Sequence, residues 1–341
     1  MQATQVTKQS FLDKTFKLKE NKTNIRTEVL AGITTFMTMA YILVVNSNIL
    51  ADAGMDKGAA FTATAIGAFI GSCIMGILAN YPVALAPGMG LNAFFAYTVV
   101  LSMGYSWQFA LCAVFIEGII FILMSVTNIR EKILDCIPNV LKDSITAGIG
   151  LFIAFVGLAN CGLVTNGATI LQLGNLQDPL VLLTIFGLIV ISILLAKNVK
   201  GAFLIGMLIV SAVGMAIGLV EVPNAVVSSV PSMKPVFLQA LSIPFDQIFS
   251  FDMFMVVLTF LFMDLFTTVG CLVGVASKGN MLDEDGKLPR VKQALLSDSI
   301  ATTVGALLGT STVTSYVESA AGIGEGGRTG LTAITTGFMF L

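Results

Sequence analysis

Residues 309–322 have the sequence GTSTVTSYVESAAG, a hydroxyl-rich segment between two apolar ones. Only 26 residues separate Asp298 from Glu325, whereas one helix that crosses a bilayer needs about 20 residues. Two full helices therefore do not fit. If Arg328 lies on the inner side, this stretch must still cross twice, and we expect part of its backbone to be extended or unwound. The alternative is a single helix whose Ser and Thr hydroxyls bond to its own carbonyls, which would place Arg328 outside.

A second segment, residues 84–95 (ALAPGMGLNAFF), also interrupts an apolar run. Pro87 removes a backbone donor and clashes with the preceding helical turn, while Gly88 and Gly90 allow almost any backbone conformation. Backbone groups freed inside a bilayer must find partners in the protein or line a cavity. We therefore expect this segment to unwind at mid-depth and to face a site. The alternative is a proline kink that only helps helices to pack.

The overall composition agrees with a chain that lies in a bilayer. Its 341 residues are 56% hydrophobic and only 11% charged, whereas a soluble domain carries about 25% charged residues. The net charge of −2 shows no excess of basic residues of the kind that binds nucleic acid. The sequence has no His, and its five Cys are scattered singly. The composition therefore predicts neither a metal site nor a disulfide framework, and we expect no cofactor.

Long apolar runs predict an all-α polytopic membrane protein. Residues 1–27 are polar and rich in Lys. They lack the short apolar core of a signal peptide, so we expect them to form a cytoplasmic tail. The expected spans, including one short segment and the start of a last span, are residues 29–50, 59–79, 83–101, 107–127, 144–164, 180–196, 202–220, 253–276, 293–309, 311–323 and the run after Arg328.

Basic residues fall on one side of this arrangement. With the N-terminus inside, the tail and the inner loops contain 16 of the 18 Lys and Arg residues, and only Lys57 and Lys234 lie outside. Cytoplasmic loops of membrane proteins are enriched in Lys and Arg. The bias therefore predicts a multi-pass protein of the cell membrane with a cytoplasmic N-terminus. We expect residues 129–143 to form a short interfacial helix or loop, 219–251 an outer loop and 277–292 an inner loop.

Some features of the sequence occur twice at a constant spacing. Gly71 corresponds to Gly305 and Gly88 to Gly322, and seven spans separate the copies. Copies an odd number of spans apart face opposite ways in the membrane, which is the inverted repeat of secondary transporters. Only 13 residues follow Arg328, enough for about 20 Å of helix. We therefore expect a C-terminally truncated chain whose second copy is incomplete.

Three carboxylates lie in the expected spans. Asp264 is the only charged residue from 253 to 276, and a charge at the bilayer centre costs at least about 2.5–3.5 kcal/mol. Glu318 lies in the hydroxyl-rich segment, and Glu117 lies in the middle of 107–127. Asp264 and Glu318 have two interpretations. In the functional one they form part of a polar site, and in the structural one each carboxylate caps the end of a neighbouring helix. For Glu117 we favour the structural interpretation, a hydrogen bond to nearby Ser or Thr.

Asp264 and Glu318 are also the candidates for proton coupling, because His is absent and burial disfavours a charged carboxylate. Either group would then bind and release a proton. The same groups accept hydrogen bonds from N–H donors. An uncharged ring with several N–H groups would suit two carboxylates, an Asn amide and backbone groups, but the residues alone leave the ligand open.

Four stretches of the sequence carry a family resemblance: TEVLAGITTFMTMAYILVVN (27–46), APGMGLNAFFAY (86–97), FMDLFTTVGCLVGVA (262–276) and GTSTVTSYVESAAGIGEGGRTGLTA (309–333). They resemble the AzgA-like purine permeases, which belong to the nucleobase:cation symporters with the uracil-permease-type fold. The last stretch is long and specific, and the resemblance covers nearly the whole chain.

The resemblance implies a 7+7 inverted-repeat fold of fourteen spans, with short extended segments in the broken third and tenth spans that meet at the binding site. This chain would then contain about ten and a half of those spans, while the rest of the gate domain would be absent. Its parts would be a tail (1–27), a first core part with spans 1–4 (28–127), a first gate part with spans 5–7 (128–221), an outer loop (222–250) and a second core part (251–341).

The resemblance also implies a function and a site. AzgA-like members move hypoxanthine, guanine and adenine together with protons. The acidic residue of the family's eighth span matches Asp264, its Glu in the tenth span matches Glu318, and its polar residue in the third span matches Asn92. We expect these three, with Gly90 and Thr314, to bind the purine, and Asp264 or Glu318 to carry the proton. The residues expected to support the site are Glu117, Pro87, Gly88 and Ser319.

Other functions stay open at this point. A carrier of the same fold for uracil, xanthine or an anion is the main alternative, although acidic groups in a site repel an anion. A channel would conduct without saturation. An intramembrane serine protease needs His, a metalloprotease needs HExxH, and Asp298, the only partner for Asp264 in an aspartyl enzyme, is expected close to the inner loop. The preferred purine, the choice of proton or sodium, and a homodimer also stay open.

Overall fold

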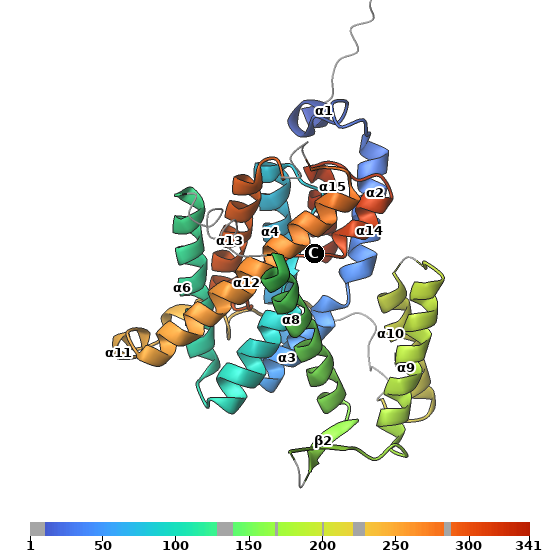
Figure 1. The fold of residues 1–341 in the computed structure, drawn as a ribbon, viewed down its shortest axis with the longest axis vertical. Helices are drawn as coiled ribbons and strands as arrows, with labels where there is room; N and C mark the ends of the chain where they lie inside the picture. The colour runs from blue at the N-terminus through green and yellow to red at the C-terminus, as the bar shows by residue number, and fades with distance from the viewer. Residues whose placement is uncertain (1–10, 128–138, 168–169, 200, 221–228, 283–287) are drawn as a thin grey trace, which may run out of the picture.

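The computed structural model describes residues 11–127, 139–167, 170–199, 201–220, 229–282 and 288–341, which are mostly helical (Figure 1). Up to residue 173 its elements are α1 (Phe11–Phe16), α2 (Ile25–Met39), α3 (Ile42–Asp52), α4 (Lys57–Ile74), the π-helix η1 (Met75–Ala79), β1 (Leu85–Pro87), α5 (Met89–Ala93), the π-helix η2 (Phe94–Ser102), α6 (Trp107–Val126), α8 (Asn139–Asn160), β2 (Val164–Gly167) and β3 (Ile170–Leu173). They are followed by α9 (Pro179–Ala196), α10 (Ala202–Ala216), the 3-10 helix η3 (Gln239–Leu241), α11 (Phe245–Ile248), α12 (Phe251–Lys278), α13 (Val291–Leu308), β4 (Val313–Ser315), α14 (Ser319–Gly324) and α15 (Gly330–Phe340).

Several of these helices are long and apolar enough to cross a bilayer. In the described part of the chain, five helical stretches meet that criterion: Ile25–Asp52, Lys57–Ala79, Trp107–Val126, Pro179–Ala196 and Phe251–Lys278. All five coincide with expected spans. Shorter apolar helices occupy other expected spans, among them Met89–Ser102, Ala202–Ala216 and Gly330–Phe340. The arrangement agrees with the prediction of an all-α polytopic membrane protein.

Side-chain caps fix where the long helices begin. The carboxylate of Asp56 accepts from the Ala59 amide at 2.7 Å, and Ser106 and Ser250 accept in the same way from residues three positions ahead. An N-cap side chain satisfies one of the amides that the first helical turn leaves without a partner, which stabilises the helix by about 1 kcal/mol. The polar residues between apolar runs therefore set the ends of α4, α6 and α12.

Both interruptions foreseen in the sequence are extended, and they pair with each other. Strands β1 and β4 are antiparallel, with Ala86 opposite Thr314. The ladder continues at both ends, since the Gly88 amide donates to the Thr312 carbonyl and the Tyr316 amide donates to the Ala84 carbonyl, each at 3.0 Å. The alternatives of a proline kink and of one continuous helix are therefore wrong, because these backbone groups bond between segments and not within a helix.

The structure departs from the sequence-based expectations at three places. The expected span 144–164 is α8, which ends at Asn160 and leads into the unpredicted hairpin of β2 and β3. The expected outer loop 219–251 contains η3 and α11 in its described part. The expected interfacial segment 129–143 lies outside the described residues up to position 138, and from Asn139 onward it is already part of α8.

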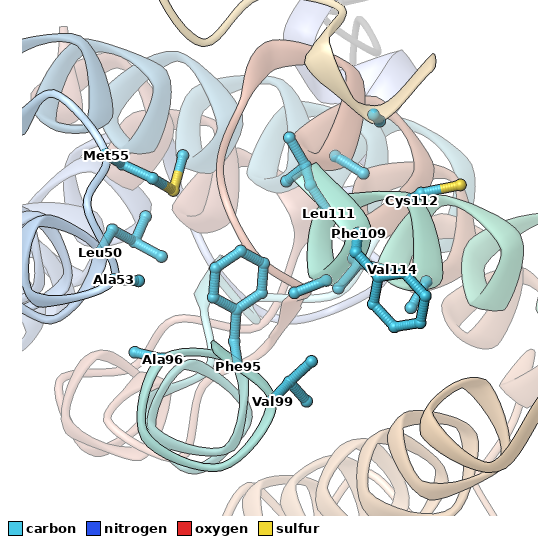
Figure 2. Packing of buried hydrophobic residues seen from close by; sticks show 14 of the residues in the cluster. Leu50, Ala53, Met55, Phe95, Ala96, Val99, Phe109, Leu111, Cys112 and Val114 are labelled. Atoms are coloured by element: carbon cyan, nitrogen blue, oxygen red, sulfur yellow. The ribbon is translucent and has the colours of Figure 1, made fainter. Parts of the chain in front are cut away.

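A tightly packed apolar cluster joins the first spans. Figure 2 shows Phe95 and Val99 of η2 facing residues of α3 and α6, among them Leu50 and Phe109. All four are almost completely buried. Because lipid tails are as apolar as these side chains, close van der Waals packing stabilises such contacts in a bilayer. This cluster holds α3, η2 and α6 in place on the side of the expected outer loops and thereby positions the segment that contains β1.

Helices α9 and α10 lie side by side (Figure 1), and α10 also contacts the first span, where the ring of Phe203 lies 5.9 Å from that of Tyr41. They approach closely through small residues: a Cβ at Gly206 of α10 would lie 2.3 Å from the side chain of Ile191 on α9. The remaining faces expose large apolar side chains such as Leu182 and Leu188. In a membrane-embedded chain, hydrocarbon and further protein are the surroundings that suit such faces.

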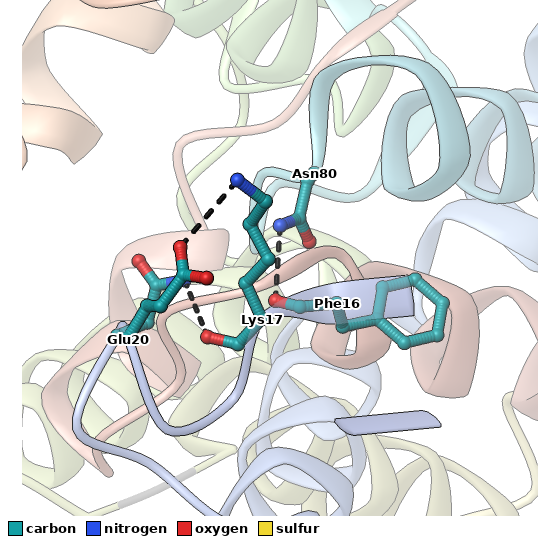
Figure 3. Close-up of polar contacts among 5 residues, drawn as sticks. Phe16, Lys17, Glu20 and Asn80 are labelled. Carbon is teal, nitrogen blue, oxygen red and sulfur yellow. Dashed lines mark hydrogen bonds and ion pairs between the residues drawn. The ribbon is translucent and has the colours of Figure 1, made fainter. Parts of the chain in front are cut away.

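Polar contacts tie the N-terminal segment to two distant parts of the chain. The side chain of Asn80, which follows η1, donates to the Phe16 carbonyl at 3.0 Å (Figure 3). Its Oδ1 accepts from the amide of Gly330 at 2.7 Å. In the same region Lys17 and Glu20 form an exposed ion pair at 3.4 Å (Figure 3). Asn80 therefore joins residue 16, the end of η1 and the start of α15.

The basic residues expected on the inner side come together. Lys22, Arg290 and Arg328 line one cavity of about 640 Å³, although they belong to three different segments of the chain. The alternative that would put Arg328 on the opposite side from Arg290 is therefore wrong. The break between β4 and α15 returns the chain to the side of Arg290.

We expect Gly330→Ala to destabilise the fold. A Cβ at position 330 would lie 2.0 Å from the Gly76 carbonyl oxygen, and because this neighbour is backbone it cannot rotate away. Forced overpacking costs about 1–3 kcal/mol. Thermal unfolding of the purified protein in detergent measures the effect. Gly324→Ala is the matched control, since a Cβ there meets no atom within 4 Å. Equal midpoints for the two variants would contradict this packing.

Candidate functional site

The paired segments border a cavity of about 470 Å³, within the usual size range of ligand pockets, about 300–1,000 Å³. Its lining comes from the residues after β1, from β4 and its C-terminal flank, from α12 and from Gly150 of α8. The lining residues are Gly88, Met89, Gly90, Leu91, Gly150, Phe266, Thr267, Gly270, Cys271, Thr314, Ser315, Tyr316, Val317 and Glu318. Among these residues Glu318 alone is charged, and Phe266 and Tyr316 are aromatic.

Glu318 lies between β4 and α14, and its carboxylate has a partner on the first span. The Tyr41 hydroxyl donates to Glu318 Oε1 at 2.8 Å. Tyr41 occupies the short break between α2 and α3, so an interruption in the first helix brings this donor into position. Glu318 therefore enters the cavity with one oxygen already hydrogen-bonded.

Asp264 and Asp298 belong to a second, fully buried polar cluster behind the cavity wall. The hydroxyl oxygen of Thr268 lies 3.1 Å from Asp264 Oδ1, 2.9 Å from Asp298 Oδ2 and 2.8 Å from the Thr314 hydroxyl. Asp298 Oδ1 also accepts from the backbone amide of Ser315 at 3.1 Å. Thr314 lines the cavity, so Asp264 reaches the cavity wall through two hydroxyl groups.

Asn92 is the centre of a third cluster, also completely buried. Its Nδ2 donates to Asn46 Oδ1 at 2.6 Å, and its Oδ1 accepts from the Ser311 hydroxyl. Asn46 in turn donates to the hydroxyls of Thr64 at 2.7 Å and Thr310 at 3.1 Å. Asn92 therefore links the segment after β1 to the segment before β4 and to the first two spans.

The residues expected to support the site hold the two extended segments in place. The Thr312 hydroxyl donates to Glu117 Oε2 at 3.2 Å, as the structural interpretation of Glu117 requires. Ser319 Oγ accepts from the Ala84 amide at 3.0 Å, and the Pro87 carbonyl accepts from the Tyr316 hydroxyl at 2.5 Å. At Gly88 a Cβ would lie 2.7 Å from the side chain of Thr314, so the close approach of the segments needs glycine there.

The expected site residues thus separate into three groups. Gly88, Gly90, Thr314 and Glu318 line the cavity. Asp264 and Asn92 are fully buried behind it, within hydrogen-bonded clusters. The remaining three lie outside the cavity lining: Pro87 is part of β1, while Glu117 and Ser319 bond to the extended segments.

Sequence reasoning missed several members of these clusters. Asp298 was expected close to the inner loop, and that expectation is wrong, because Asp298 is completely buried beside Thr268. Asn46 and Tyr41 were not singled out. A usable signal existed for Asp298 and Asn46, since both lie inside expected spans, where a polar side chain is a candidate for function by default.

Comparisons with known proteins agree with this architecture. The profile described as the permease family matches residues 26–341. The chain belongs to this family. It is therefore a multi-pass membrane permease and not an enzyme.

Individual relatives cover almost the whole chain. The guanine/hypoxanthine permease PbuG of Bacillus subtilis is 50% identical over 336 residues, which are 96% of this chain and 76% of the relative. The adenine permease AdeP of Escherichia coli is 45% identical over 341 residues, which are 99% of this chain and 75% of the relative. Among solved structures, the transmembrane domain of the cyanobacterial bicarbonate transporter BicA matches with a TM-score of 0.66 at 16% identity, covering 93% of this chain and 82% of that one. The permease thus shares the fold of a known transporter domain.

We expect Thr268→Val to lower the thermal stability of the permease more than the loss of an exposed hydroxyl group does. The change keeps the side-chain shape but removes the hydroxyl that connects two buried carboxylates and Thr314. A buried polar group left without its partner costs about 1–3 kcal/mol. Thermal unfolding in detergent provides the measurement. Thr259→Val on the same helix is the control, because that exposed hydroxyl bonds only to the Met255 carbonyl of its own helix. A Thr268→Val midpoint as high as the control's would refute the central role of this hydroxyl.

Proposed function

We propose that this permease carries purine nucleobases across the membrane. Two relatives that match nearly the whole chain at 45–50% identity are named as guanine/hypoxanthine and adenine permeases. The structural observation that carries the proposal is the cavity between the two paired broken segments, with Glu318 as the charged residue among its lining residues.

The chemistry of the cavity suits a flat, uncharged ring with N–H donors. The Glu318 carboxylate accepts hydrogen bonds from ring N–H groups and, with one oxygen held by Tyr41, keeps capacity to accept more. The glycines at 88 and 90 allow a ligand to approach the backbone closely. The aromatic side chains of Phe266 and Tyr316 add apolar ring surface to the lining.

An anion carrier of the same fold is the second candidate, because the BicA domain shares the architecture. The lining residues of the cavity argue against it. They include Glu318 and no Lys or Arg, so a small anion would meet a negative charge without a compensating positive one. A likeness at 16% identity supports a common fold and says nothing of the solute.

We further propose transport by alternating access between a core (28–127 and 251–341) and a gate part (128–221). Gly150 of α8 contributes to a cavity otherwise lined by core residues, so the cavity lies at the boundary between the two parts. Another contact crosses the same boundary: Asn160 of α8 donates to the Tyr97 hydroxyl, which donates to Asp52, each at 2.8 Å. Sliding of α8 against the core would break this exposed chain of hydrogen bonds and open the cavity.

The number of hydrogen-bond donors around Thr268 supports a proposal of proton coupling. Its single hydroxyl proton has two neighbouring carboxylate oxygens, on Asp264 and Asp298, while Thr314 can donate to the Thr268 oxygen. A proton held on one of the two carboxylates would supply the donor for the remaining contact. We therefore propose that this cluster, together with Glu318, exchanges the coupled proton as the solute binds at Thr314.

The substrate proposal is tested by uptake of labelled hypoxanthine, guanine, adenine and uracil into cells that produce the protein. We expect saturable purine uptake, reduced at least about tenfold by Glu318→Gln, because a hydrogen bond to a charged group contributes about 1.5–3 kcal/mol. Glu325→Gln is the control, since that exposed carboxylate lies seven residues on, outside the cavity lining. Transport of bicarbonate without transport of any base would favour the anion carrier and sink the purine proposal.

Coupling is tested in membrane vesicles with an imposed proton or sodium gradient. We expect an inward proton gradient to drive purine accumulation and a sodium gradient alone to have no effect. Asp264→Asn should still permit exchange of labelled purine for unlabelled purine but abolish accumulation, because the amide cannot take up a proton. Accumulation that persists after the proton gradient is collapsed would show that the carboxylate cluster serves another purpose.

A further inference from the structure

A second cavity, of about 640 Å³, lies apart from the one described above and shares no lining residue with it. It is lined by the turn before α2, by Tyr81 two residues after η1, by both described ends of the loop between α12 and α13, and by the loop between α14 and α15. The lining residues used below are Lys22, Thr23, Asn24, Tyr81, Arg290 and Arg328.

Positive charge dominates the described lining. Lys22, Arg290 and Arg328 face a single carboxylate, that of Glu20, which is already paired with Lys17 at 3.4 Å. The Arg328 guanidinium is held by hydrogen bonds to the Ile323 and Gly327 carbonyls at 2.8 and 2.7 Å. Two Arg and one Lys from separate segments therefore converge without a matching number of acids among these residues.

Two buried hydroxyl groups of the lining have no acceptor for their protons among the described residues. Tyr81 is only 2% exposed, yet its hydroxyl and that of Thr23 are buried and donate no hydrogen bond to an acceptor among the described residues. A buried donor without an acceptor is costly and calls for a ligand or water. Burial raises the pKa of Tyr81 to about 12, although the Arg290 charge opposes the shift, so this hydroxyl keeps its proton and remains a donor.

The helix start and the arginine geometry complete the site. Asn24, the N-cap of the 15-residue helix α2, and Thr27 of its first turn are part of the lining, so the positive end of the helix dipole faces the cavity. The Arg290 guanidinium lies 4.8 Å from the centroid of the Tyr81 ring. This stacking holds the guanidinium beside the Tyr81 hydroxyl, which interacts with Arg290 and keeps its own proton to donate to an anion.

We propose that this cavity binds a phosphate-bearing anion, either a free phosphate or the headgroup of an anionic phospholipid. A phosphate offers several strong acceptor oxygens, which suits three cationic side chains and two hydroxyl donors. Bound there, it would join the N-terminal segment to the loops that follow α12 and α14, and it would stabilise the face on which the basic residues gather. The proposal is independent of which solute the permease carries.

Three acidic residues in the sequence oppose this proposal. Residues 283–285 are Asp, Glu and Asp and lie outside the described residues. An anion must bind in spite of their charge, so the assay compares phosphate with chloride at equal ionic strength, where general screening is the same.

Thermal unfolding of the purified protein, titrated with inorganic phosphate in neutral detergent, tests the site. We expect a saturable rise of the midpoint, absent with sodium chloride at equal ionic strength. Lys22→Gln and Arg290→Gln should each weaken the apparent affinity about tenfold, as the loss of a charged hydrogen bond implies. Tyr81→Phe should weaken it several-fold, because it keeps the ring and removes the unused donor. Lys234→Gln, an exposed Lys expected on the other side, should bind like the parent.

The two sources of phosphate are separated in nanodiscs. A higher midpoint in phosphatidylglycerol than in phosphatidylcholine, reduced by Lys22→Gln, would assign the site to a lipid headgroup. A rise with inorganic phosphate in phosphatidylcholine nanodiscs would assign it to a free phosphate. Lys22 is exposed, so this variant should fold even if Arg290→Gln does not. The proposal is overturned if neither probe raises the midpoint or if Lys22→Gln responds like the parent. Purine uptake is measured separately, so its failure would leave this result unaffected.

Discussion

The antiparallel pairing of β1 with β4 is the constraint on which the rest of the structure depends. Inside a bilayer no water is present to bond an extended backbone, so every freed N–H and C=O group needs a protein partner. Each three-residue strand supplies the partner of the other. The outer edges are closed by side chains: the Ser72 hydroxyl accepts from the Leu85 amide at 2.9 Å, and the Thr302 hydroxyl donates to the Val313 carbonyl at 2.9 Å. Neither broken segment would be stable without the other.

This pairing also places the polar clusters. Asp298 accepts from the Ser315 amide on β4 and contacts Thr268 at the same time. A change of protonation in the Asp264 and Asp298 cluster would therefore act on a strand whose residues line the cavity. On the other side, Asn92 joins the residues after β1 to Ser311 before β4. The solute cavity and the coupling candidates are thus connected through the backbone of two short strands, without a long path between them.

The sequence predicted the breaks well because they rest on local and additive rules. Pro87 with its neighbouring glycines forbids a regular helix, and the stretch from Asp298 to Glu325 is too short for two full spans. It predicted the cavity-lining side chains less well. In an unwound segment there is no helical period that tells which residue faces a site, so the sequence did not show that Thr314 lines the cavity. Asp264 lies on the regular helix α12, but the sequence did not show which face of that helix meets the cavity. Asn46 and Thr310, which form a hydrogen bond, lie 264 residues apart. This contact depends on the tertiary fold, and no local sequence pattern predicts it.

The constant spacing between the two copies gives the arrangement of charges a further meaning. In the sequence, this spacing aligns the 18 residues of α4 with the 18 residues of α13. Thr64 then corresponds to Asp298. Both residues bond to a side chain from the preceding long helix, Thr64 to Asn46 and Asp298 to Thr268. The scaffold is similar in the two halves, but the first half fills its cluster with neutral amides and hydroxyls, whereas the second contains Asp264, Asp298 and, at the cavity, Glu318. Neutral groups can hold the strands together at no cost in charge burial, so they suffice for structure. The two carboxylates of the cluster around Thr268 are costly to bury. That cost agrees with the proposal that this cluster takes up and releases a proton, a task which neutral groups cannot perform.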